Sequence, residues 1–300
     1  MCAVAAVTLV LGACADGDIG EAAAEAPAST AAVERNPDTA APSTTVSPST
    51  TSSTTPAPSS TTSTTTTTTT LPPITVGFAG DTSFTHGLHS RDPLGDIAEQ
   101  LREPDVMIVN LETTVAEPDV GRAIQKRFTF KSPPVSGELL FDAGVDVAAL
   151  ANNHALDYGP EAVVRTIEIL EEADVATVGT GANREQAYSA LHIEVEGWDL
   201  AVLSFSRVPC DSPEPGESYI EEVAWACSDF EELTLDAVAA AADADFTIVM
   251  VHWGIQRKKC PADHQFDLAA KWVSAGADAV IGSHPHVLQG VERIDGAWVV

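Results

Sequence analysis

Residues 151–159, ANNHALDYG, decide the fold because they stand between two segments with regular hydrophobic patterns. The apolar run at 145–150 predicts a buried strand, and residues 160–171 predict a helix with Pro160 in its first turn. Open α/β sheets build their sites at the carboxyl ends of strands, where Asn153 and His154 would lie. The plainer alternative is a polar turn in which His154 is satisfied locally.

The rest of the chain alternates between strand and helix patterns. Strands are predicted at 74–79, 105–109, 175–178, 246–251, 279–281 and 297–300, and helices at 93–102 (with Asp92 as N-cap), 137–143, 233–242 and 263–275. Residues 191–205 alternate around Gly197 and predict a β-hairpin, residues 128–131 a short extended piece, and residues 209–218 a loop. This alternation predicts a mainly parallel α/β fold.

Five of the predicted strands end in side chains that bind metal ions. Strand ends in a parallel sheet lie along one edge, so these side chains are expected to converge, and a set of carboxylate, Asn and His is typical of a metal site. The plainer alternatives are a capping role for Asp81 and a surface carboxylate at Glu112. The candidate metal-binding residues are Asp81, Glu112, Asn153, His252, His284 and His286. His86 and His89 are expected in an exposed loop, and His192 and His264 in structural roles.

The first 14 residues have the pattern of a bacterial lipoprotein signal, with Cys14 as the lipidated residue of the mature chain. The apolar run at 4–12 is too short to span a bilayer. No Lys or Arg precedes this run, which leaves a start further upstream open. The alternative is a free cysteine in a short apolar leader. We therefore expect an extracytoplasmic protein anchored to the cell membrane by a lipid.

Residues 15–73 consist mostly of Ala, Ser, Thr and Pro and include seven consecutive threonines at 64–70. Such a segment has no apolar period and is expected to be a disordered linker. As a flexible coil it would span roughly 45 Å. The globular domain is expected at 74–300.

The charge and the cysteines restrict the partners and the compartment. The net charge of −29 disfavours nucleic acid and anionic membrane surfaces as general partners. Three cysteines fall in the predicted domain, at positions 210, 227 and 260. In an oxidising exterior the simplest expectation is one disulfide, with Cys210 and Cys227 the closest pair in sequence, and one free thiol.

Six ordered blocks over residues 74–300 resemble the CapA family of bacterial poly-γ-glutamate capsule synthesis, whose domain is similar to the calcineurin-type metallophosphoesterase fold. The blocks are GD at 80–81, NLE at 110–112, ANNHALDYG at 151–159, VGTGA at 178–182, HWG at 252–254 and GADAVIGSHPHVLQ at 276–289. The resemblance implies a β-sandwich flanked by helices, with metal at the strand ends.

The resemblance also implies roles for single residues. The six candidate metal-binding residues would be ligands, with Glu112 in the bridging role, and His154 would be the catalytic residue that assists the leaving group. Three positions depart from the expected patterns: Ser83 replaces a histidine, Glu112 an aspartate and Gln256 a glutamate. Mixed Asn, His and carboxylate ligands suit Mn, Fe or Zn.

Three functions from different classes remain open on the sequence alone. The first is a surface-anchored CapA-like protein in the synthesis, export or anchoring of an anionic polymer, within a membrane-bound capsule synthesis complex. The second is a metal-dependent hydrolase acting on a phosphoester or a γ-glutamyl amide. The third is a non-catalytic binding subunit with a vestigial site. We expect the basic cluster Arg257, Lys258 and Lys259 to bind poly-γ-glutamate or a phosphate, with a solvated loop as the alternative. We also expect a chain that is incomplete after Val300, because the family normally continues from there, which could leave one sheet edge unpaired.

Overall fold

The computed structural model describes residues 71–91, 93–208, 224–226 and 231–300. Several predictions lie outside the described residues: the signal segment at 1–14, the linker up to residue 70, the N-cap at Asp92 and the loop at 209–218. The same holds for Cys14, Cys210 and Cys227. None of the described helices is both long and apolar enough to cross a membrane.

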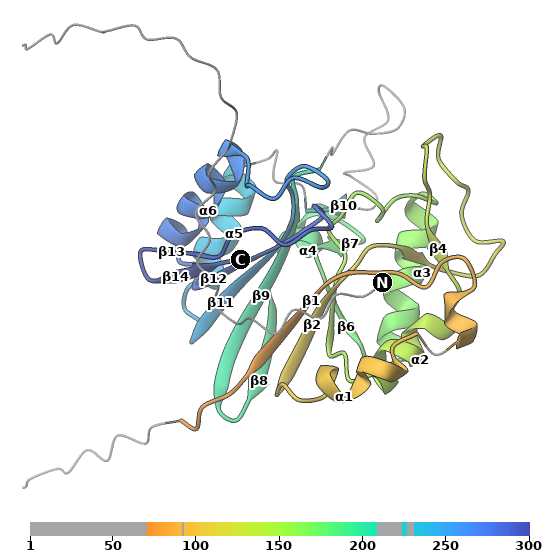
Figure 1. Cartoon of the computed structure of the whole chain (residues 1–300), viewed down its shortest axis with the longest axis horizontal. Helices are drawn as coiled ribbons and strands as arrows, with labels where there is room; N and C mark the ends of the chain where they lie inside the picture. The colour runs from red at the N-terminus through yellow and green to blue at the C-terminus, as the bar shows by residue number, and fades with distance from the viewer. Residues whose placement is uncertain (1–70, 92, 209–223, 227–230) are drawn as a thin grey trace, which may run out of the picture. The chain divides into compact units, whose positions relative to one another are not determined.

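The first of two sheets is entirely parallel. It contains β1 (Val76–Thr82), β2 (Val106–Leu111), β5 (Val147–Ala149) and β6 (Ala176–Val178), in this spatial order. Its outer face packs against α1 (Ala98–Leu101), α2 (Val135–Asp142) and α3 (Pro160–Glu172), as Figure 1 shows for α2 and α3.

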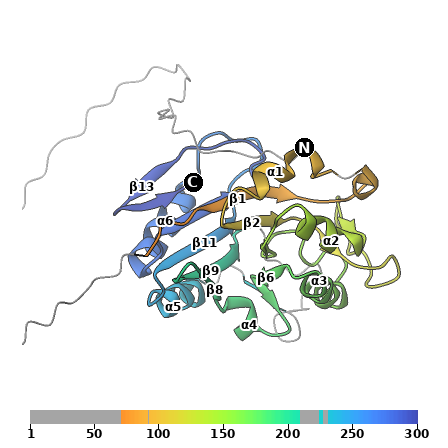
Figure 2. The ribbon, with the colours of Figure 1, turned by 90° about the horizontal axis from the view of Figure 1, so that it is seen from below.

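The second sheet has six strands in the order β13-β14-β12-β11-β9-β8. The central strands β9 (Trp198–Ser206), β11 (Phe246–His252), β12 (Ala279–Ser283) and β14 (Ala297–Val299) are parallel. The edge strands β8 (Leu191–Val195) and β13 (Glu292–Ile294) are antiparallel to their neighbours. Helices α5 (Glu231–Ala241) and α6 (Asp263–Ala275) cover the outer face (Figures 1 and 2).

The two sheets face each other across an apolar core, and this explains the composition of their strands. On β2, Val106 and Ile108 point into the space between the sheets, whereas Met107 and Val109 pack against the helices. On β11, Ile248 and Met250 point inward and Val249 and Val251 outward. A strand covered on both faces is mostly apolar along its length, which is why the sequence shows nearly continuous apolar runs at both strands. The predicted fold, a β-sandwich flanked by helices, is confirmed.

Helix boundaries follow local sequence signals. Helix α3 begins at Pro160, after Gly159 with φ of +82°, and buries Ala162, Val163, Thr166, Ile169 and Leu170 along one face. Helix α6 ends before Gly276, whose φ of +122° is unfavourable for a residue with a side chain.

The predictions differ from the structure in the irregular segments. One helix was predicted at 93–102, but the structure has a 3₁₀ turn at Gly95–Ile97 followed by the short α1. The reason is that Gly95 and Asp96 have poor helix propensity. A preceding 3₁₀ turn spans Leu88–Arg91. The extended piece predicted at 128–131 is β4 (Lys131–Ser132), paired with β3 (Thr114–Val115). Short elements missed by the prediction are α4 (Arg184–Tyr188), β13, and the pair β7 (Thr180–Gly181) and β10 (Ala224–Trp225).

Replacing Trp272 with alanine should lower the free energy of unfolding by about 3–5 kcal/mol. The indole is fully buried, packs on Phe205 and Trp253, and donates its Nε1–H to Thr234 Oγ1 at 2.9 Å. The matched control is Phe266→Ala on the same helix, because Phe266 is 45% exposed and its loss should change stability by less than about 1 kcal/mol. Denaturant unfolding of the full chain, followed by far-UV circular dichroism, measures both. Equal losses in the two variants would contradict the assigned packing.

Candidate metal centre

The candidate centre lies where the carboxyl ends of strands from both sheets meet. Asp81 lies in β1, Glu112 directly follows β2, and His252 ends β11. Side chains join the two sheets here, since Asn110 Nδ2 on β2 lies 3.2 Å from His252 Nδ1 on β11. The backbone N–H of His284, just beyond β12, donates to Asp81 Oδ2 at 3.2 Å. Because the strands are parallel, side chains from distant segments of the chain meet at a single edge of the sheets, as the sequence predicts.

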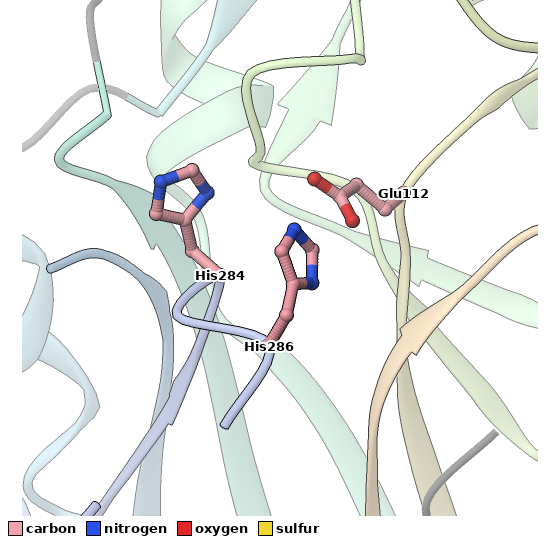
Figure 3. Close-up of side chains that lie close together, drawn as sticks. All are labelled: Glu112, His284 and His286. Carbon is pink, nitrogen blue, oxygen red and sulfur yellow. The ribbon is translucent and has the colours of Figure 1, made fainter. Parts of the chain in front are cut away.

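Three side chains lie close enough together to hold one metal ion. Glu112, His284 and His286 each offer a ligand atom, and these atoms lie within 4.8 Å of one another. Figure 3 shows the Glu112 carboxylate turned toward the two imidazole rings, which come from the loop after β12.

His252 extends this group toward the first sheet. Its Nε2 lies 2.7 Å from Asn153 Oδ1, 3.0 Å from His284 Nδ1 and 3.4 Å from Glu112 Oε1. His286 Nδ1 lies 2.8 Å from Asp81 Oδ2. The structure therefore brings together all six residues proposed as ligands from the sequence: Asp81, Glu112, Asn153, His252, His284 and His286.

The two carboxylates of the centre have different environments. Burial raises the pKa of Asp81, but the hydrogen bond from His286, the charges of His252 and His286 and the hydrogen bond from Asn110 outweigh it and lower this pKa. Burial, followed by the charge of Asp81, raises the pKa of Glu112 to about 7. Asp81 is therefore a fully hydrogen-bonded anion, whereas the charge of Glu112 lacks comparable compensation.

The buried histidines are neutral at physiological pH. Burial lowers the pKa of His252 to about 3 and that of His284 to about 3. A neutral imidazole keeps a lone pair on one nitrogen, and this is the form that binds metals. Asn153 Oδ1 only accepts hydrogen bonds and lies 2.7 Å from His252 Nε2, so the ring hydrogen is on Nε2. The lone pair of His252 is then on Nδ1, beside Asn110 Nδ2 at 3.2 Å and Ser283 Oγ at 3.0 Å. Neutral imidazoles beside a carboxylate with a raised pKa are a donor set that fits a divalent metal.

Backbone strain fixes the turn that carries two of these rings. His284 and His286 have φ angles of +93° and +53°, which side chains rarely adopt, on either side of Pro285. The carbonyl of Pro285 accepts a hydrogen bond from the Arg257 N–H at 2.7 Å, and Arg257 itself has a φ of +63°. Strained residues persist where the surroundings hold them, and such sites are frequently functional.

His154 lies beside the centre and is held by a buried carboxylate. Its Nδ1 lies 2.6 Å from Asp157 Oδ2, and its ring stacks on Phe130 with a centroid distance of 4.0 Å. Its Nε2 lies 3.8 Å from Glu112 Oε1. Asp157 is fully buried and also accepts from the Phe130 N–H at 2.6 Å and from Lys126 Nζ at 2.9 Å. Since a carboxylate only accepts hydrogen bonds, His154 carries a hydrogen on Nδ1 and turns Nε2 toward the centre.

The basic cluster of Arg257, Lys258 and Lys259 is exposed and lies in the loop between β11 and α6. The hydrogen bond to Asp81 raises the pKa of His286, and the nearby charge of Arg257 opposes this rise. The basic cluster therefore adjoins the centre.

The remaining histidines and the departures from the family patterns have separate positions. His86 is exposed, and His192 is exposed and lies 3.0 Å from Asp199. His89 and His264 are half-buried. Ser83 Oγ hydrogen-bonds to Thr85 Oγ1 at 3.3 Å, and Gln256 is exposed beside the basic cluster.

Residues that hold the ligands were harder to find from the sequence. Asn110 donates to Asp81 Oδ1 at 2.7 Å, and Asn152 Nδ2 donates to Asn110 Oδ1 at 3.3 Å and to the Leu111 carbonyl at 2.9 Å. Asn110 and Asn152 both lie within the sequence motifs quoted above, and this position was the only indication in the sequence that they support the site. Lys126 and Phe130 come from a loop without any motif, so only the fold reveals them.

Comparisons with known proteins agree with this geometry. The family model of the bacterial capsule synthesis protein PGA_cap matches residues 74–300. The capsule biosynthesis protein CapA of Bacillus anthracis is 35% identical over 50% of this chain and 37% of its own length. The PGA biosynthesis protein CapA of Bacillus subtilis is 28% identical over 66% of this chain and 52% of its own length. The chain thus spans about half the length, or less, of these relatives.

A further relative and a solved structure are also similar to this chain. A probable polyglutamine synthesis accessory protein of Mycobacterium tuberculosis is 28% identical over 64% of this chain and 52% of its own length. The crystal structure of a phosphatase from Mycoplasma pneumoniae is 15% identical, with a TM-score of 0.50, over 77% of this chain and 72% of that one. At this identity the similarity extends to the fold alone. The match to the family model covers the whole two-sheet domain and every residue of the candidate centre, and the chain therefore belongs to the bacterial capsule synthesis protein family, the CapA family.

Proposed function

We propose that this protein acts at the cell surface in the synthesis, export or anchoring of an anionic capsule polymer, such as poly-γ-glutamate, through a metal-dependent hydrolase-type site. One observation carries the hydrolase part: imidazole nitrogens and the Glu112 carboxylate converge within 4.8 Å at the strand ends. Family membership and the capsule-related names of the relatives support the polymer.

Six residues would hold the metal, with Glu112, His284 and His286 as its central group and Asp81, Asn153 and His252 around them. Mn, Fe or Zn suits this mixture of ligands. When bound, a metal of this kind would lower the pKa of a coordinated water and so supply hydroxide at neutral pH. Because only two of these residues are anionic, the centre keeps a positive character and accepts an anionic substrate.

His154 would take up a proton from solvent on Nε2 and pass this proton to the leaving group. Its Nδ1 is committed to Asp157, so Nε2 is the atom available for the reaction. Asp157 fixes the orientation of the ring, and the stacking on Phe130 restricts its rotation. This arrangement serves the cleavage of a phosphoester and of a γ-glutamyl amide equally, because either leaving group needs one proton.

Two further parts of the chain would place the site on its substrate. Lipidation at Cys14 would anchor the protein, and the segment up to residue 73 would let the domain reach into the wall, where a capsule synthesis complex operates. The exposed cluster of Arg257, Lys258 and Lys259 would recruit the polymer, since it adjoins the turn that carries His286.

Protein loaded with Mn, Fe or Zn should retain stoichiometric metal after desalting, and the double variant Glu112→Ala with His284→Ala should lose most of it. The reason is that this variant removes two of the three central donors. His192→Ala is the matched control, because this exposed histidine on β8 lies at the far edge of the second sheet. Elemental analysis measures the metal. Retention by the double variant, or an equal loss in the control, would refute the assigned ligands.

Replacing His154 with alanine should lower kcat by about 10²–10⁴-fold and leave the metal content unchanged. The assay follows p-nitrophenyl phosphate and a γ-glutamyl polymer in parallel, and the substrate whose turnover depends on His154 identifies the reaction. If the metal-loaded wild type turns over neither substrate, the hydrolase part of the proposal is wrong and the centre serves binding only.

Reversing the charge of the basic cluster (Arg257→Glu, Lys258→Glu and Lys259→Glu) should weaken binding of the γ-glutamyl polymer by roughly tenfold or more at low salt, and by less at high salt. The control reverses three exposed basic residues elsewhere, Arg102, Lys271 and Arg293, and so has the same net charge. Fluorescence anisotropy with a labelled polymer gives both affinities. Unchanged binding in the first variant would exclude this cluster as the recruiting surface.

A further inference from the structure

A lysine that the proposed chemistry leaves unused lies next to His154. Lys126 belongs to the loop between β3 and β4, and its ammonium donates to Asp157 Oδ1 at 2.9 Å and to the carbonyl oxygen of Asn153. Its side chain is 28% exposed, whereas Asp157 is fully buried. The ammonium is therefore fixed in place and still accessible to solvent.

The hydrogen-bond count leaves one donor of this ammonium available. Lys126 Nζ lies 3.3 Å from His154 Nδ1, but that nitrogen already carries a hydrogen for Asp157 and cannot accept another. A lysine ammonium has three donors, and two are used by Asp157 and Asn153. No other acceptor within the described part of the chain has a hydrogen bond to Nζ, so the third N–H can bind an incoming ligand.

The charge of Lys126 also acts on the centre. Burial and the charge of Asp81 raise the pKa of Glu112, and Lys126 is one of the positive groups that oppose this rise. Burial is the main cause of the low pKa of His252, and the Lys126 charge adds to it. The ammonium also lies beside the ring that faces the centre, since Lys126 Nζ is 3.3 Å from His154 Nδ1.

We propose that Lys126 binds an anionic group, a carboxylate or a phosphate, on the leaving-group side of the substrate and thereby determines specificity. This inference rests on the proposed function, because His154 defines the leaving-group side. The basic cluster at Arg257–Lys259 adjoins His286 instead, and so lies against the opposite sheet. The preferred substrate therefore carries negative charge on both sides of the bond that breaks, as a linear polyanion does and a simple monoester does not.

The test compares two pairs of ligands, each differing in one negative charge on the leaving group. The pairs are 4-carboxyphenyl phosphate with 4-carbamoylphenyl phosphate, and γ-glutamyl-alanine with γ-glutamyl-ethylamine. Lys126→Met should reduce the preference for the charged member by about tenfold or more in kcat/KM, because a charge-assisted hydrogen bond is lost. Lys126→Arg should keep most of the preference. Arg122→Gln is the control, since it removes a positive charge from the same loop at an exposed position.

Binding measured without turnover separates this inference from the proposed function. Each ligand is titrated by calorimetry into the full chain with a chelator present, so that the preference is read as a ratio of affinities. Structural damage in Lys126→Met would weaken both members of a pair equally and leave the ratio unchanged. The inference would be overturned if the ratio of affinities were unchanged in Lys126→Met, or if Arg122→Gln lost the preference equally. It would also be overturned if the wild type showed no preference. These outcomes hold whether or not the protein hydrolyses either pair. The pair that shows the effect tells whether the bound group belongs to an aryl ester or to a peptide.

Discussion

The carboxylate of Asp81 joins the two sheets at their functional edge. Asn110, on the neighbouring strand of the same sheet, donates to Oδ1, and the backbone of His284, from the other sheet, donates to Oδ2. The apolar core between the sheets sets their spacing but is non-directional, so it does not fix how far one sheet slides along the other. Hydrogen bonds of defined geometry at the strand ends do fix it. The positions of the candidate ligands therefore depend on these strand-end contacts, and those of Asp81 reach both sheets.

Two buried carboxylates lie in the same centre and have opposite pKa shifts, which separates their roles. Asp81 has donors on both oxygens, and these outweigh its burial and lower its pKa. Glu112 has only ring nitrogens nearby, at 3.4 Å from His252 and 3.8 Å from His154, and its pKa rises to about 7. The hydrogen-bonded carboxylate of Asp81 holds the strand ends together. The carboxylate of Glu112, whose charge is poorly compensated, is the one that a bound cation would stabilise most.

The sequence predicted the regular elements and the residues of the centre, for a shared physical reason. Strands buried on both faces, such as β2 and β11, stand out as apolar runs, and the polar residue that ends each run is conspicuous. Helix α6 was predicted with its observed bounds because Gly276 ends it. The helix at 98–101 was predicted too long because the poor helix propensity of Gly95 and Asp96 was overlooked. The pair β3 and β4 was not predicted correctly, since tertiary contacts rather than local patterns determine it.

The role of Lys126 was hidden in the sequence for a different reason. No periodicity or spacing connects this residue to His154, because the link runs through Asp157, which both side chains contact. The same carboxylate also accepts from the Phe130 N–H, so one buried group positions the imidazole and the loop that carries the ammonium. The proton-handling group and the adjacent positive charge are consequently fixed in a single geometry. An unpaired carboxylate at this depth would be costly, and the same hydrogen bonds that satisfy it prevent either group from moving independently. The spacing of His154 and Asp157 within the ANNHALDYG stretch therefore determines more than a turn, because it sets the position of the His154 imidazole relative to the Lys126 ammonium.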